Sequence, residues 1–96
     1  MLNKVQLIGR VGKEIELKYT VSGKAVINMS LATSYSQDGE KKTEWHNITA
    51  FGKLAENIQK YVKKGHQLYI EGALRTDKWD ANGKTHYKTY VVAQRS

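Results

Sequence analysis

Residues 43–56 read TEWHNITAFGKLAE, and this stretch decides the fold. If its first half is a strand, successive side chains alternate between two faces. The odd-numbered face then places polar residues between two aromatics: Trp45, Asn47, Thr49 and Phe51. A core face would not normally carry Asn and Thr there, and a purely solvated face would not carry Trp and Phe. The pattern therefore predicts a wet binding surface, with His46, Ile48 and Ala50 turned toward the interior or a neighbouring subunit.

The composition predicts one basic domain, residues 1–96. Sixteen Lys and Arg against nine Asp and Glu give a formal net charge of +7. This balance favours an anionic partner, with nucleic acid ahead of an acidic membrane surface, although a merely basic surface is the plain alternative. The sequence contains no cysteine, which excludes disulfides and thiolate metal sites.

Hydrophobic alternation of period two runs through most of the chain. It predicts strands over residues 4–11, 25–33, 43–51, 66–79 and 86–93, with the first strand bending at Gly9 and Gly12 and continuing over 15–20. Helical spacing appears once and predicts a helix over residues 54–64, ended by Lys63, Lys64 and Gly65.

Two turn signals connect these strands. Asp38-Gly39, inside a polar loop over residues 34–42, and Asn82-Gly83 both predict antiparallel hairpins. Five strands with one helix between the third and the fourth is the element order of an OB-fold, an all-β barrel. A generic small β-barrel is the alternative.

Four motifs follow one another along the chain: EWHNITAFGKLAE at 44–56, YVKKG at 61–65, LYIEG at 68–72 and LRTDKW at 74–79. In this order they resemble the bacterial-type single-stranded DNA-binding protein (SSB) family. Residues 3–12 and 25–34 resemble the first strands of that family, so the resemblance covers essentially the whole chain. It implies an OB-fold that coats single-stranded DNA during replication, recombination and repair, usually as a homotetramer, with a dimer as the alternative.

The candidate DNA-binding residues combine aromatic rings with cations. Every unpaired base has a π-face, so aromatic platforms bind single strands with little regard for sequence, and Lys or Arg pair with the phosphates. The proposed platforms are Trp45, Phe51 and Trp79, for which burial is the alternative. The cations that match basic positions of the resembled family are Lys53, Lys64, Arg75 and Lys78, and a solvated charge is the alternative for each. Tyr35 and Lys18 are further candidates.

Some positions depart from the family's pattern. Asn47 and Asp77 stand where the family usually has basic residues, and Tyr35 or Gln37 is nearest to the loop tryptophan that the family carries. The family also ends in a flexible tail with an acidic tip, whereas this sequence ends at Ser96, so tail-mediated partners are not carried over. The histidine that matches His46 belongs to a subunit contact in the family, and Tyr69 is a second candidate for such a contact.

Enzyme chemistry is not indicated. His46, His66 and His86 lack the spacing of metal ligands, and Gly23-Lys24 lacks the earlier glycine of a phosphate loop. We therefore expect no cofactor and no metal. The N-terminus lacks the apolar run of a signal peptide, which favours a cytoplasmic protein, nucleoid-associated or in a host cytoplasm if phage-encoded. An OB-fold protein-interaction module with weak strand affinity is the alternative function, and RNA is an alternative ligand.

Overall fold

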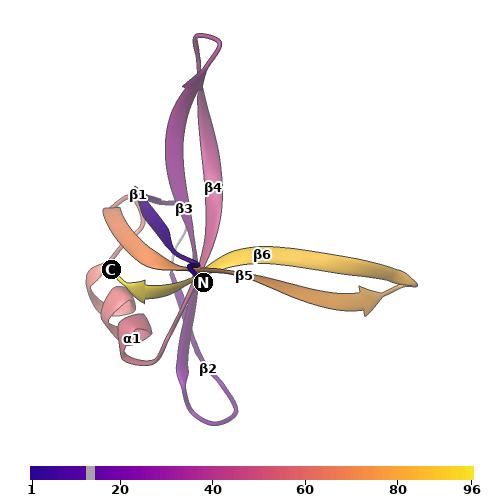
Figure 1. The fold of residues 1–96 in the computed structure, drawn as a ribbon. Coiled ribbons are helices and arrows are strands. Elements are labelled where there is room, and N and C mark those ends of the chain that lie inside the picture. The colour runs from indigo at the N-terminus through magenta and orange to yellow at the C-terminus, as the bar shows by residue number, and fades with distance from the viewer. Residues whose placement is uncertain (13–14) are drawn as a thin grey trace.

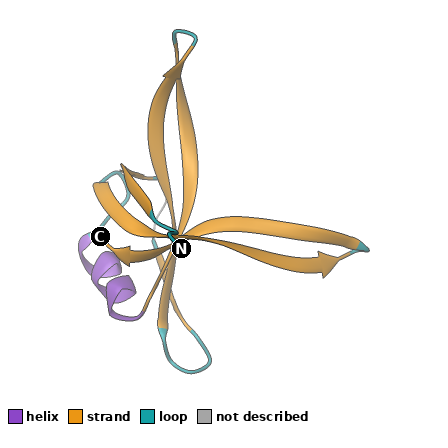
Figure 2. Cartoon of the chain, viewed as in Figure 1, coloured by secondary structure: helices purple, strands orange, loops and turns teal. Residues whose placement is uncertain are grey.

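The computed structural model describes residues 1–12 and 15–96 and shows a small barrel with long arms (Figure 1). Its elements in chain order are β1 (Val5–Val11), β2 (Glu16–Tyr19), β3 (Ala25–Gln37), β4 (Glu40–Phe51), α1 (Gly52–Tyr61), β5 (Gln67–Ala81) and β6 (Lys84–Arg95). Figure 2 shows that strands make up most of the chain and that α1 lies against one side of the barrel.

The sheet has the order β1-β5-β6-β4-β3-β2, and a further pairing of β1 with β3 closes it. Arg10 and Val11 of β1 pair with β3, and so does all of β2, so β1 and β2 are two halves of one bent strand. Counted in this way the barrel has five strands, with α1 between the third and the fourth. The predicted OB-fold is confirmed.

The core is apolar and fills the barrel. The alternation on β3 and β4 delivers Ile27, Leu31 and Ile48 to the inside, where each is at most 1% exposed. Helix α1 adds Ala55 and Ile58 from one side of its surface. The inward-facing positions of these strands supply the apolar burial that stabilises the fold. The outward-facing positions are therefore not needed for the core and can serve binding.

Two hairpin arms project from the barrel in different directions, β3–β4 and β5–β6 (Figure 1). Both end in two-residue turns with positive φ at each position: Asp38 and Gly39 in one, Asn82 and Gly83 in the other. Turns of this kind match the twist of the flanking strands, so pairing continues up to the turn. The predicted hairpins are thus observed, but the predicted polar loop over 34–42 is wrong, because β3 and β4 stay paired as far as Gln37 and Glu40.

The helix boundaries also differ from the prediction. α1 begins at Gly52 and ends at Tyr61, whereas residues 54–64 were expected. Val62 is already extended, with φ −107° and ψ 135°, and its N–H donates to the carbonyl of Ile58 at 2.8 Å. Residues 63–65 then form a reversal in which Gly65, at φ 89°, donates to the carbonyl of Val11. The cations and glycine therefore mark this reversal and not the last helical turn.

A register shift lies between Glu71 and Gly72 in the pairing of β5 with β6. A Cβ on Gly72 would collide with the backbone of Val92, so only glycine allows the two strands to approach this closely. Irregularities of this kind bend a strand, and the outer half of β5 continues beyond it into the arm.

Candidate nucleic-acid interface

The centre of the site is the outward face of β4. Trp45, Asn47 and Phe51 are exposed there, and Thr49 is partly exposed, while Ile48 and Ala50 are buried. The predicted alternation is therefore observed. The four outward residues pair laterally with β3, whose Asn28 and Ser30 lie opposite Thr49 and Asn47.

Trp45 is a supported but open aromatic ring. Its side chain is 56% exposed. The six-membered part of its indole packs so closely on Gly12 that a Cβ there would overlap with it. The ring also borders two hollows, of about 350 Å³ toward Arg10 and Gln67 and about 190 Å³ toward Asn47 and Tyr90. A flat ring that is supported at Gly12 and more than half exposed can stack a nucleobase.

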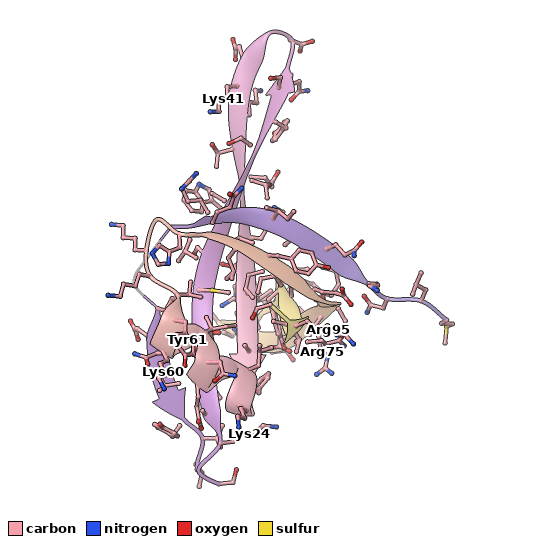
Figure 3. The ribbon with its side chains drawn as sticks, turned by 90° about the vertical axis from the view of Figure 1, so that its left-hand side faces the viewer. Lys24, Lys41, Lys60, Tyr61, Arg75 and Arg95 are labelled. Atoms are coloured by element: carbon pink, nitrogen blue, oxygen red, sulfur yellow. The ribbon has the colours of Figure 1, made fainter. Side chains whose placement is uncertain are left out.

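Phe51 ends β4 and is 38% exposed. The Nζ atom of Lys24 lies 5.5 Å from the centroid of its ring, a cation–π geometry. Lys24 precedes β3, and Figure 3 shows it at the lower end of the barrel near the start of α1. Lys24 thus places a positive charge beside an aromatic platform, and the sequence analysis did not include it.

Trp79 lies on the β5–β6 arm and is 46% exposed. The imidazole of His86 stacks on its indole, with centroids 5.6 Å apart and planes 20° apart. The imidazole covers one face of the indole and connects β6 to β5 at this point of the arm. A base would therefore have the other face of the indole available to it.

Three cross-strand pairs lie on the outer face of the β5–β6 arm, the face that carries Trp79. Arg75 pairs with Tyr90, Asp77 with Lys88 and Trp79 with His86. Tyr90 and Lys88 border a hollow of about 210 Å³ together with Phe51, which joins this face to that of β4. Lys18 of β2 and Lys88 both border a second hollow, of about 230 Å³, beside Asn47. The barrel thus brings two of the predicted cations, Lys18 and Arg75, onto the aromatic face, and their contact with phosphates stays a prediction.

The remaining candidates border none of the hollows beside the aromatic rings. Lys78 adjoins Trp79 in the strand and pairs with Tyr87, so it points to the opposite face of the arm. Tyr35 pairs with Lys42 on the β3–β4 arm, and both residues point to the face opposite to that of Trp45. Two further cations lie at α1: Lys53 in its first turn, and Lys64 after its end, in a separate hollow with Ile15 and Val62. Their participation stays a prediction.

Asp77 adds a negative charge to this face, and Glu16 beside Lys18 adds another. The hydroxyl of Tyr90 donates to the Oδ1 atom of Asp77 at 3.1 Å. The pKa of Tyr90 is raised, first because burial disfavours the phenolate and then because this hydrogen bond and the charge of Asp77 favour the neutral form. Tyr90 is therefore held as a neutral hydrogen-bonding group beside the hollow that Phe51 borders.

The two candidate contact residues lie away from the aromatic face. His46 is half-buried, and its Nε2 atom lies 2.9 Å from the hydroxyl of Thr33. Tyr69 lies on the outer face of β5, donates to Glu71 at 2.7 Å and accepts from Gln6 at 3.1 Å. These hydrogen bonds place both residues, and their role in assembly stays a prediction.

The site therefore contains residues that the sequence analysis missed: Gly12, Lys24, His86, Lys88 and Tyr90. The last three had a sequence signal, because counting outward from the Asn82-Gly83 turn pairs them with Trp79, Asp77 and Arg75. Lys24 had a signal too, because counting outward from the Asp38-Gly39 turn pairs Val26 with Phe51 and leaves Lys24 two residues away on the same face. Gly12 had none, because only the closure of the barrel brings it to Trp45.

Two further features were searched for in the described part of the chain. Residues 1–12 and 15–96 contain no group of three or more His, Cys, Asp or Glu side chains that could hold a metal ion. Nor does this part include a helix with the length and apolar character needed to cross a membrane. The chemistry of the site is that of exposed rings, amides and cations on a curved sheet.

Such a face on an OB barrel defines a class of binding proteins for single-stranded nucleic acid. Residues 2–96 match the family described as the single-strand binding protein family. A solved structure from Plasmodium falciparum, described as an SSB complex with ssDNA, is similar to this chain. The TM-score is 0.89 at 36% identity, over 96% of this chain and 86% of that one. The chain belongs to the single-strand binding protein family, and it is accordingly a single-stranded DNA-binding protein and not an enzyme.

Proposed function

We propose that this protein coats single-stranded DNA largely without regard to sequence, by stacking bases on aromatic side chains and pairing phosphates with Lys and Arg. The observation that supports this proposal best is the exposure of Trp45, Phe51 and Trp79 on connected outer faces of β4 and β5. Each stacked base contributes roughly 1–3 kcal/mol, and because every base has a π-face this contribution is tolerant of sequence.

The cations near these rings are available for phosphates. Lys24, Lys88 and Arg75 form no ion pair with any residue that the structure describes, and Lys18 lies 3.6 Å from Glu16 in a solvent-exposed pair. A surface pair of this kind is weak, so a phosphate can replace its carboxylate. When Lys and Arg pair with phosphates, the strand releases its bound counterions, so binding weakens as salt rises.

We further propose that copies of the chain associate, four together in preference to two, through contacts that include His46 and Tyr69. Ile8, the residue opposite Tyr69 in the β1–β5 pairing, is 63% exposed, which leaves apolar surface for a second copy. The processes we propose for the protein are replication, recombination and repair in the cytoplasm, where single strands must be protected.

A comparison of titrations with oligo-dT and with duplex DNA of equal length tests whether the protein coats single strands. We expect oligo-dT to quench the tryptophan fluorescence, duplex DNA to do so weakly, and the affinity to fall steeply with salt. Sedimentation of the free protein measures the assembly, and His46→Leu should change the mass if the residue lies in a contact. The absence of quenching at low salt would instead favour the protein-interaction module, for which Asp77 on the outer face is the supporting observation.

A further inference from the structure

The side chain of Asn3, which lies ahead of β1, is bonded to the base of the β5–β6 arm. The N–H of Leu74 donates to the Oδ1 atom of Asn3 at 2.9 Å, and the Nδ2 atom of Asn3 donates to the carbonyl of Leu74 at 3.0 Å. A side-chain amide carries the same donor and acceptor as a peptide group, so Asn3 pairs with Leu74 as a residue of a neighbouring strand would.

The two hydrogen bonds allow only one orientation of this amide. Its oxygen accepts from an N–H and its nitrogen donates to a carbonyl, so turning the amide over would oppose like groups in both contacts. Asn3 also lies in register with the ladder of β1 and β5. The last backbone pair of that ladder is Val5 with Gly72, and two residues further along the two segments lie Asn3 and Leu74. The side chain therefore extends the ladder by one pair.

This pair lies where the arm leaves the barrel (Figure 1). Beyond Gly72, β5 pairs only with β6 among the residues that the structure describes, apart from the contact with Asn3. β6 pairs with β4 at two residues, Val91 and Val92. The base of the arm is thus tied to the barrel at both edges, by Asn3 on the β5 side and by β4 on the β6 side. A two-stranded ribbon twists strongly and is weak by itself, so these ties determine its direction.

The direction of the arm determines how Trp79 lies relative to β4. Phe51 of β4 and Tyr90 of the arm border one hollow, so the outer face of the arm begins beside β4. Trp79 lies further out, beyond the pairs that Arg75 and Asp77 make with β6. A change of angle at the base displaces Trp79 more than it displaces the residues near β4. One strand can therefore stack on Phe51 and on Trp79 together only if this angle is held.

We propose that Asn3 is a positioning residue for strand binding, which holds the β5–β6 arm at the angle where Trp79 and the platforms of β4 stack on bases of the same strand. This inference rests on the proposed function and extends it to a residue that acts through Trp79. Two sites held in a fixed relation bind one strand tightly, because occupation of the first raises the effective concentration at the second. Loss of Asn3 therefore weakens strands that reach both sites and spares strands that reach one.

The test compares a long with a short oligo-dT, of about 16 and about 4 nucleotides, the limits of the site sizes of single OB-folds. Asn3→Ala should weaken binding of the long strand roughly fivefold, the lower end of what one stacked base contributes. It should leave the affinity for the short strand unchanged, because each platform is intact. Quenching of tryptophan fluorescence measures both affinities, and thermal melting confirms that the variant folds.

Two further variants assign the effect to the tie between Asn3 and the arm. Thr76→Val is the matched control, because it removes the hydrogen bond of 3.0 Å between the hydroxyls of Thr76 and Thr89 inside the same arm and keeps the contact of Asn3 with Leu74. It should bind both strands as the wild type does. In a Trp79→Ala background, Asn3→Ala should weaken the long strand much less than in the wild type, because a residue that acts through another is not additive with it.

The outcomes separate this inference from the proposed function. No loss of affinity in Asn3→Ala, or equal losses for the long and the short strand, would overturn the positioning role and leave the coat intact. A loss that persists in full without Trp79, or that Thr76→Val reproduces, would likewise overturn it. Failure of the wild type to bind the long strand at low salt would instead overturn the proposed function.

Discussion

The indole of Trp45 rests directly on Gly12, with no room for a Cβ between them. The N–H of Gly12 donates to the carbonyl of Ser30 at 3.0 Å, which fixes this support to β3 beside the outer face. Trp45 itself pairs with Ala32, another small residue on that face. The platform is therefore held by two small residues, and the orientation of its ring depends on their size.

Gly12→Ala should displace Trp45 and weaken binding of oligo-dT. The expected loss is at most that of one stacked base, roughly 1–3 kcal/mol, because the methyl group removes the support but leaves the other platforms in place. Fluorescence titration measures the affinity, and thermal melting checks that the barrel is intact.

A double-mutant cycle tests whether Gly12 acts through Trp45. The combined variant Gly12→Ala/Trp45→Ala should bind about as weakly as Trp45→Ala alone, because residues in contact are not additive. If the two losses add in full, Gly12 affects binding by a route other than the indole.

Trp79→Ala should weaken strand binding by a similar amount, roughly 1–3 kcal/mol. His86→Ala should weaken it less, because the platform remains and only its brace is lost, and His86→Phe should restore much of that loss by keeping a stacked ring. Tyr87→Ala is the matched control, since Tyr87 is an exposed aromatic on the opposite face of the same arm. If Tyr87→Ala weakened strand binding more than Trp79→Ala, the DNA would bind the face of the arm opposite to the one we propose.

The sequence predicted whatever depends on local pattern. Alternation in β4 assigned Ile48 to the core and Trp45 to the surface, and the Asp38-Gly39 and Asn82-Gly83 turns predicted both hairpins. The sequence also indicated that Lys78 and Trp79 lie on opposite faces, because neighbours in a strand alternate, although we predicted that both bind DNA.

What could not be predicted depends on how distant segments meet. Gly12 reaches Trp45 because the barrel closes, and no spacing in the sequence encodes that contact. The end of α1 was misplaced for a related reason. Gly65 donates to Val11, so the tertiary contact with β1 starts the reversal earlier than the cations alone suggested.

Lys88→Gln should reduce the salt dependence of binding as well as the affinity. If Lys88 pairs with one phosphate, the slope of log K against log salt should become shallower by about 0.7 for a single strand. Lys60→Gln is the control, because Lys60 lies on α1 with its Nζ atom over the ring of Tyr61 and is not among the predicted DNA-binding cations. Titrations at several salt concentrations measure both slopes, and an unchanged slope for Lys88→Gln would remove it from the phosphate path.

Asp77→Asn should strengthen strand binding, because it removes a negative charge from the face shared by Arg75 and Lys88. The asparagine oxygen can still accept from Tyr90, so the local hydrogen bond is retained. The gain should be roughly threefold at low salt and should largely disappear at high salt, where exposed charges are screened. A gain that does not depend on salt would point to a change in structure and not in charge.

Glu71 should make the stability of the barrel depend on acidity. Tyr69 donates to its carboxylate at 2.7 Å and Lys4 lies 3.2 Å away, and these two contacts hold the pKa of Glu71 below its ordinary value. A lowered folded-state pKa means that the contribution to stability is present above about pH 4.5 and is lost as pH falls through the folded value.

Glu71→Gln should therefore lose less melting temperature than the wild type between about pH 7 and about pH 3. Glu16→Gln is the matched control, because the Glu16 side chain is 73% exposed and its contact with Lys18 is 3.6 Å, a pair that solvent screens. It should keep the pH dependence of the wild type. Circular dichroism melts of the three proteins at both pH values make the comparison. If Glu71→Gln loses as much as the wild type, the link from Lys4 through Glu71 to Tyr69 does not stabilise the β1–β5 side of the barrel.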